Sequence, residues 1–482
     1  MDKAAGRFRV SQGISAPILD LGLMLSLLVL CFLGGGGSRN DVISLLYLQP
    51  AAAALLVIAA ARARTEDLRT LRIPLLLLAL FAAVHILQLI PLPPAIWEQL
   101  PLRTMFAETA AAIGQPPAWR PISIAPDLTL GSLVGLIVPA AAMLLAARLR
   151  SRQHEQLLWV IAAGILLSVL LAALQLTAGE ESPYHLYEIT NKGIAVGLFA
   201  NRNHQAALLA AGMPLLAVLL SSASTQRLGS VWRLAITIGG CLLLMIMILV
   251  TGSRAGLALA LVGIISAGAL FRPGRLGGAR GRRHALLLII ASVGGVSALY
   301  ALLNYQRAAT LIRLTGLEYA NESRIANFGL YVQMVKDHFL LGSGLGTFDP
   351  LFRIYEPYSD LKPTYLNHAH NDLMELLMTG GLAAAALLLG FLVWYVRRSI
   401  EAVRAGDRLA LLGAVFVLVL LLASTADYPL RTPLLACLFG LCVTWLSTTR
   451  QADKSPANSV ASGPRYRSNS SARAAARDHA HK

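Results

Sequence analysis

The stretch that decides the fold reads LAITIGGCLLLMIMILV over residues 234–250, TGSR over 251–254 and GLALALVGIISAGALF over 256–271. Both long runs are apolar and uncharged, and they approach the roughly 18 to 20 residues that cross a bilayer as a helix. The short polar stretch between them leaves room only for a tight turn at one membrane face. The sequence therefore predicts two consecutive membrane spans with Arg254 at the turn.

Similar apolar runs recur through the whole chain of 482 residues, of which 56% are hydrophobic and 14% charged. A soluble globular protein has about 25% charged residues. We therefore expect an all-α, polytopic membrane protein with about 12 transmembrane helices and a large periplasmic helical loop at about 304–374. The predicted spans are 18–34, 42–61, 74–90, 130–147, 157–176, 204–221, 234–250, 256–271, 285–303, 375–396, 409–425 and 430–447.

The basic residues set the predicted orientation. The net charge is +16, and Arg clusters at 148–152, 272–283 and 397–398 fall in alternate connections between spans. By the positive-inside rule, these connections and both termini are cytoplasmic. Residues 1–17 then form a cytoplasmic N-terminus, 18–447 the membrane domain, and 448–482 a disordered cytoplasmic tail. Because topology and contacts with anionic membrane lipids explain the charge, it requires no nucleic-acid partner.

Arg254 is the first candidate functional residue. An arginine this close to membrane-buried sequence is costly unless it faces a cavity or a partner, so we expect it to bind a ligand. The alternative is that its side chain extends to the membrane interface. The cysteines all lie in apolar runs and predict neither a disulfide framework nor a metal site.

Arg324 is the second candidate. It follows a predicted helix start at Asn321-Glu322-Ser323 and precedes apolar residues at helical spacing. The first turn of a helix favours anions, so an arginine there gains nothing from the helix dipole and suits a ligand. A salt bridge to Glu318 or Glu322 is the equal alternative.

The densest polar cluster is 367–372, NHAHND, directly before a predicted span. Asn371 or Asp372 can cap that helix, and a neutral His370 at a helix N-terminus can act as a general base. A structural cap alone is the main alternative. His368 and His370 form only an H-x-H pair, so a metal site is the weaker interpretation.

Two further outer segments contain candidate substrate-binding residues. Arg202 and Asn203 lead into a span and offer a guanidinium and an amide at the membrane boundary. Asp427 and Arg431 lie in the tight turn between the last two spans, where the alternative is that they pair with each other.

In their order and spacing, these motifs resemble the O-antigen ligase and O-antigen polymerase superfamily of bacterial inner-membrane glycosyltransferases. The segments that resemble the family are 87–93 (LQLIPLP), 201–204 (NRNH), 252–256 (GSRAG), 342–348 (GSGLGTF), 370–373 (HNDL), 380–382 (GGL), 427–431 (DYPLR) and Arg324. The ligase pattern matches His370, Asn371 and Gly381, but Ala384 stands where it expects Gly, Thr or Tyr. This departure favours a polymerase over a ligase.

The resemblance implies a type C glycosyltransferase-like fold and transfer at the periplasmic face, in lipopolysaccharide or exopolysaccharide biosynthesis. It implies an undecaprenyl-diphosphate-linked glycan as donor, and lipid A core or a lipid-linked repeat unit as acceptor, with no metal and no cofactor. Its essential residues correspond to Arg254, Arg324 and His370. A diphosphate is a good leaving group, so arginines suffice to stabilise it, and attack from the opposite side inverts the anomeric carbon.

Two other functions remain open from the sequence. Twelve spans with both termini inside also suit a small-solute or anion transporter, for example of bicarbonate, although no internal repeat is visible. A non-catalytic scaffold for polysaccharide assembly would tolerate replacement of all three essential residues.

Overall fold

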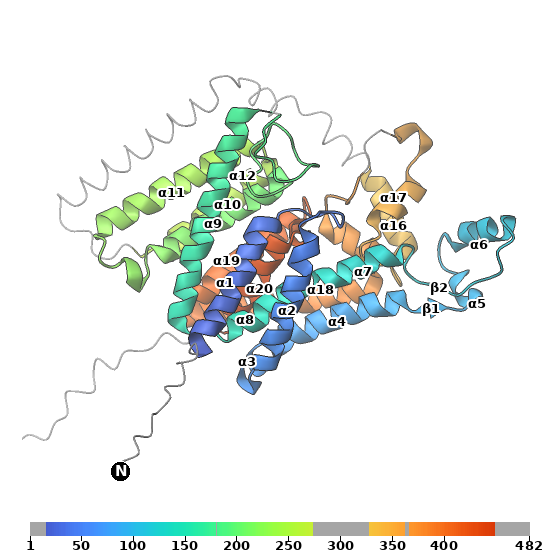
Figure 1. Cartoon of the computed structure of the whole chain (residues 1–482), viewed down its shortest axis with the longest axis horizontal. Helices are drawn as coiled ribbons and strands as arrows, with labels where there is room; N and C mark the ends of the chain where they lie inside the picture. Colours follow the sequence, from blue (N-terminus) through green and yellow to red (C-terminus); the bar gives the residue numbers. More distant parts are fainter. Residues whose placement is uncertain (1–15, 180, 273–326, 362–365, 449–482) are drawn as a thin grey trace, which may run out of the picture.

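The computed structural model describes residues 16–179, 181–272, 327–361 and 366–448, and this part of the chain is mostly helical (Figure 1). Its longer helices are α1 (Ala16–Gly34), α2 (Leu45–Arg62), α4 (Arg72–Leu89), α7 (Pro126–Gly135), α8 (Ile137–Ala147), α9 (Ser151–Ala178), α10 (Arg202–Leu219), α11 (Ser230–Thr251), α12 (Arg254–Leu270), α18 (Asp372–Ala405), α19 (Arg408–Ser424) and α20 (Pro433–Ser447).

Every predicted span except 285–303 coincides with one or two of these helices, and 285–303 lies outside the described residues. Within the described residues, seven helical segments are long and apolar enough to cross a membrane. The predicted span 130–147 is split into α7 and α8 at Leu136. The protein is therefore a helical membrane protein, and the number of twelve spans remains a prediction.

α10 lies at the centre of the bundle and is buried on nearly all sides, against α9, α11, α12 and α19. Small residues allow this close packing. On α12, a Cβ added at Gly263 would lie 2.5 Å from the backbone oxygen of Ala210 on α10. Since α10 and α12 both begin at the same end of the bundle, their N-termini are held side by side.

A second group of elements lies beyond the ends of α4 and α7 (Figure 1). It contains the two-stranded sheet β1 (Pro91–Leu92) and β2 (Arg120–Pro121), with α5 (Pro94–Trp97), α6 (Arg103–Ala112), α16 (Phe328–His338), α17 (Phe348–Tyr355) and the 3-10 turn η2 (Tyr358–Asp360). The remaining short elements are α3 (Thr65–Thr70), η1 (Ala223–Thr225) and η3 (Pro429–Arg431). The described part of the loop predicted at about 304–374 thus contains α16, α17, η2 and the start of α18, joined by non-helical stretches, whereas its predicted helix start at 321–323 lies outside the described residues.

α18 is broken one-third of the way along. Gly381 has φ 65° and ψ −157°, a backbone conformation that side chains strongly disfavour. The break leaves backbone oxygens without a partner inside the helix, and the glycine-rich loop at 342–346 donates hydrogen bonds to them. Ser343 N donates to Met378 O at 3.1 Å, and Gly344 N donates to Thr379 O at 3.0 Å. Gln88, at the end of α4, also donates to Thr379 O at 2.9 Å. The first turns of α18 are therefore fixed by α4 and this loop.

Candidate active site

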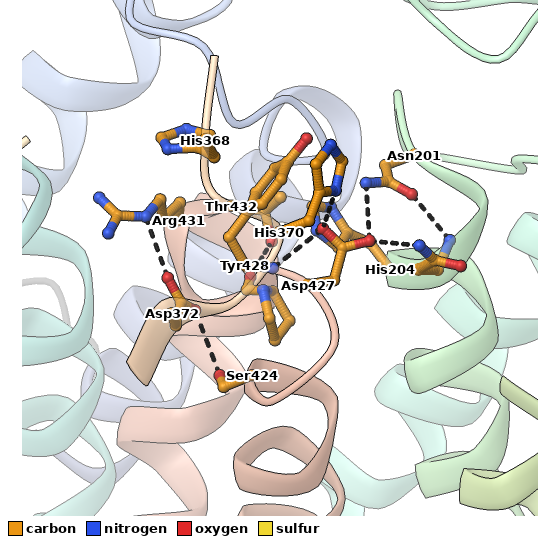
Figure 2. Close-up of polar contacts among 12 residues, drawn as sticks. Asn201, His204, His368, His370, Asp372, Ser424, Asp427, Tyr428, Arg431 and Thr432 are labelled. Atoms are coloured by element: carbon orange, nitrogen blue, oxygen red, sulfur yellow. Dashed lines mark hydrogen bonds and ion pairs between the residues drawn. The ribbon is translucent and has the colours of Figure 1, made fainter. Parts of the chain in front are cut away.

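Asp427, in the turn after α19, is the centre of a polar cluster drawn from three separate segments (Figure 2). Its carboxylate is 1% exposed and lies 3.3 Å from His370 Nδ1 and 3.7 Å from His204 Nε2. The side-chain amides of Asn201 and Asn203 donate to its other oxygen. Burial raises the pKa of the Asp427 carboxyl, but the contacts with His204 and His370 hold it well below its usual range, so it is a carboxylate.

His370 adopts an unusual backbone conformation. Its φ of 51° is in the left-handed region, which residues other than glycine rarely adopt. Strain of this kind clusters at functional sites. Directly after it, Asn371 caps α18 by accepting a hydrogen bond from Met374 N at 3.1 Å, as the sequence predicted. The tight connection from cap to histidine brings the imidazole back over the helix start, against Asp427.

Tyr428 fixes the positions of three imidazoles. Its ring centroid lies 4.3 Å from that of His368, 5.0 Å from His370 and 5.2 Å from His204. The tyrosine is 5% exposed, and burial together with the charge of Asp427 raises its pKa, so the phenol stays neutral. The ring thus holds the histidine side chains without competing with them for protons.

A second charged cluster lies beside the first, on the first turns of α18. Glu375 is fully buried and accepts from His368 Nδ1 at 3.0 Å and Ala369 N at 3.0 Å. Arg431 in η3 contacts Glu375 at 2.9 Å and Asp372 at 3.1 Å. Burial lowers the pKa of Arg431, but the charges of Glu375 and Asp372 have the larger effect, and the pKa is raised overall. The guanidinium is therefore charged.

The alternative that Asp427 and Arg431 pair with each other is wrong. Asp427 contacts His204 and His370, while Arg431 contacts the carboxylates of α18. The physical reason is the direction of the turn: η3 separates the two side chains, and each finds a partner from a different helix. Both residues are occupied by protein groups, an arrangement that favours positioning other side chains over binding substrate directly.

The candidate arginines Arg202 and Arg254 lie at the starts of α10 and α12. Ser253 caps α12 and also donates to Asn203 Oδ1 at 2.7 Å, which links the two helix starts. A side chain at Gly252 would begin 3.8 Å from Arg202 Nη1, so Arg202 lies against the turn that carries Arg254. Arg254 is exposed and forms no hydrogen bond or ion pair with the described residues. Two helix N-termini and two guanidinium groups here favour an anion.

The remaining candidate, Arg324, lies outside the described residues, and so do its alternative partners Glu318 and Glu322. In the described ranges, no group of three or more His, Cys, Asp or Glu side chains is arranged to hold a metal ion. Absence of a metal from the reaction remains a prediction from the family resemblance.

Sequence reasoning missed His204 and Glu375 as members of the site. His204 was part of a quoted motif, but its contact with Asp427 depends on the packing of α10 beside the last turn. Glu375 was the first residue of a predicted span, where an ionisable side chain is itself a signal of function. That signal predicts a charged or hydrogen-bonding partner, and Arg431 and His368 are such partners.

Comparison with known families gives one match: residues 239–389 match the model of the family described as O-Antigen ligase. Comparison with curated proteins gives no match. The matched segment includes Arg254, Arg324, His370 and the broken start of α18, whereas Arg202, Asn203, Asp427 and Arg431 lie outside it. Residues 239–389 of this membrane protein thus match the O-antigen ligase family, which confirms the resemblance drawn from its motifs.

Proposed function

We propose that the protein is an inner-membrane glycosyltransferase that transfers or polymerises a glycan linked to undecaprenyl diphosphate at the periplasmic face. The observation that carries the proposal is the His370–Asp427 pair, placed where three helices begin: α10, α12 and α18. A histidine held by a carboxylate is a general base, and helix N-termini attract the anionic part of the donor.

In the proposed reaction, a hydroxyl of the acceptor attacks the anomeric carbon of the donor glycan. Its proton passes to His370 Nε2 while Nδ1 remains directed at Asp427, which stabilises the imidazolium that forms. The new carbon–oxygen bond forms as the bond to the diphosphate breaks, and the diphosphate leaves with that electron pair. Attack opposite the leaving group inverts the anomeric carbon.

We assign the diphosphate to Arg254 and Arg202, together with Arg324 by family resemblance. The planar guanidinium binds phosphate oxygens in pairs and needs no metal to neutralise their charge. Asn203 and Asn371 hold the starts of α10 and α18, and Asp427 and Arg431 position the histidines. In this proposal the acceptor is lipid A core or a second lipid-linked repeat unit. Membrane lipids surround the helices.

The test is transfer from purified undecaprenyl-diphosphate glycan by reconstituted full-length protein, with and without EDTA. We expect His370→Ala to lower the rate by about 10² to 10⁴, the usual contribution of a general base, and EDTA to have no effect. Transfer to lipid A core identifies a ligase, and elongation of the lipid-linked glycan identifies a polymerase. A scaffold or a transporter would leave the glycan unchanged, and equal rates for His370→Ala and the unmodified protein would show that His370 is not the base. Each of these results contradicts the proposal.

A further inference from the structure

A cavity at the opposite end of the bundle carries a second inference, independent of the transfer reaction. It has a volume of about 170 Å³ and is lined by Pro17, Asp20, Arg64, Asp67, Arg148 and Arg150. α9 begins at this cavity, and its 28 residues end on the side of the candidate active site. At 1.5 Å per residue, the two sites are about 40 Å apart along that helix.

The charges around the cavity do not balance. Asp20 is held by Arg62 at 2.7 Å and by Arg148 at 3.0 Å, and Arg148 also reaches Asp67 at 3.5 Å. These two aspartates are therefore already matched by two arginines. The other two arginines of the lining are not matched by a carboxylate of the described residues.

Arg64 and Arg150 are exposed at the mouth of the cavity and form no ion pair with the described part of the chain. Inside, the Arg148 side chain is 7% exposed, and its Nε is buried without a hydrogen-bond partner among those residues. A buried donor left unpaired is costly, so Asp20 and Asp67 do not fully satisfy Arg148. The excess of positive charge in the lining indicates that the cavity suits an anion.

Two helix N-termini near the cavity also favour an anion. Pro17 lies in the first turn of α1, and Arg150 directly precedes α9. A hydrogen bond of 2.6 Å from Gln153 Nε2 to Pro17 O holds the two helix starts together. Aligned backbone N–H groups and partial positive charge at such starts bind phosphate groups.

We propose that this cavity binds a phosphate-bearing anion on the cytoplasmic side of the membrane. Basic pockets between membrane helices at this depth take the headgroups of anionic lipids, and a free phosphate offers the same chemistry. Either would neutralise the excess charge of Arg64 and Arg150. The bound group would join the starts of α3 and α9, through Arg64 and Arg150, to Arg148 at the end of α8.

The experiment titrates detergent-purified full-length protein with short-chain phosphatidylglycerol and, separately, with inorganic phosphate, and follows the Tm. The test variant is Arg64→Gln/Arg150→Gln. The control is Arg397→Gln/Arg404→Gln, which removes the same charge from exposed positions on the C-terminal part of α18. We expect the test variant to weaken binding at least about 10-fold and the control less than about 2-fold.

Arg64→Gln alone leaves α9 unaltered and should weaken binding about 3-fold or more, so a folding defect at Arg150 cannot hide the result. Competition of phosphate with the lipid assigns recognition to the phosphate group itself, and lipid binding without competition assigns it to the whole headgroup. Both outcomes support the site. Equal binding by test and control variants, or no binding of either probe, would overturn it.

Discussion

Replacing Asp427 by Asn tests the proposed base most directly, because it removes a charge and almost no volume. The carboxylate lies 3.3 Å from His370 Nδ1. At this distance a pair of unit charges interacts by about 1 kcal/mol in water and about 5 kcal/mol at an effective dielectric constant of 20. The His370 side chain is 23% exposed, which places the site between these limits. The lost stabilisation corresponds to roughly 10-fold to several thousand-fold in rate.

A second effect acts in the same direction. Asn201 and Asn203 both donate to one oxygen of Asp427, so the substituted amide must turn its oxygen toward them and its NH₂ toward His370. His370 Nδ1 then has to accept, which moves the ring proton to Nε2 and removes the base. We therefore expect kcat to fall by about 10² to 10³, near the middle of the electrostatic range.

The assay is the initial rate of glycan transfer by reconstituted protein at varied donor concentration. The donor KM should change less than about 3-fold, because the arginines assigned to the diphosphate are untouched. Asp349→Asn is the control, since Asp349 is a carboxylate on α17 paired with the exposed Arg353. Activity of Asp427→Asn within 2-fold of the unmodified protein, at normal Tm, would refute the role of Asp427.

Three further predictions concern other parts of the fold. Arg254→Lys should raise the donor KM or lower kcat by about 10-fold or more, since a lysine lacks the paired donors of arginine, whereas Arg353→Lys should leave transfer kinetics unchanged. Burial lowers the pKa of His338 to about 4, so the folded state resists protonation of this side chain. The free energy of unfolding should therefore fall as the pH drops from about 6.5 toward 4. The Tm of His338→Gln should depend less on pH over this range. Gly381→Ala should lower the Tm or the yield of folded protein, because its φ is 65° and an added Cβ would lie 2.6 Å from the backbone of the 342–346 loop; equal Tm and yield would contradict the argued need for glycine.

Local rules predicted much of the fold correctly from the sequence. Apolar runs gave the positions of the helices, and the residue type at Asn371 gave the cap of α18. These features depend on a few neighbouring residues, so the chain itself contains the information. The break at Gly381 was not predicted, because its cause is a hydrogen-bonding loop that lies far away in the sequence.

The candidate site was predicted in part, and the failures share one cause. His370 and Arg254 were singled out as candidates because their neighbours are chemically unusual, and the structure places His370 beside Asp427. The alternative pairing of Asp427 with Arg431 was wrong, and Glu375 was missed, because each of these residues has its partner in another segment. Pairing of this kind is fixed by how helices pack, and no spacing within one segment reveals it.

The break in α18 also divides the helix into two parts with different surroundings. From Gly381 to Ala405 the helix is about 36 Å long at 1.5 Å per residue, longer than the roughly 30 Å of a typical hydrocarbon core, so it must tilt or protrude as membrane thickness varies. The turns from Asp372 to Gly380, however, are tied to α4 and the glycine-rich loop rather than to that rod. Because α18 is kinked at Gly381, the turns that follow His370 keep their contacts with α4 and the loop without having to share the direction of that rod.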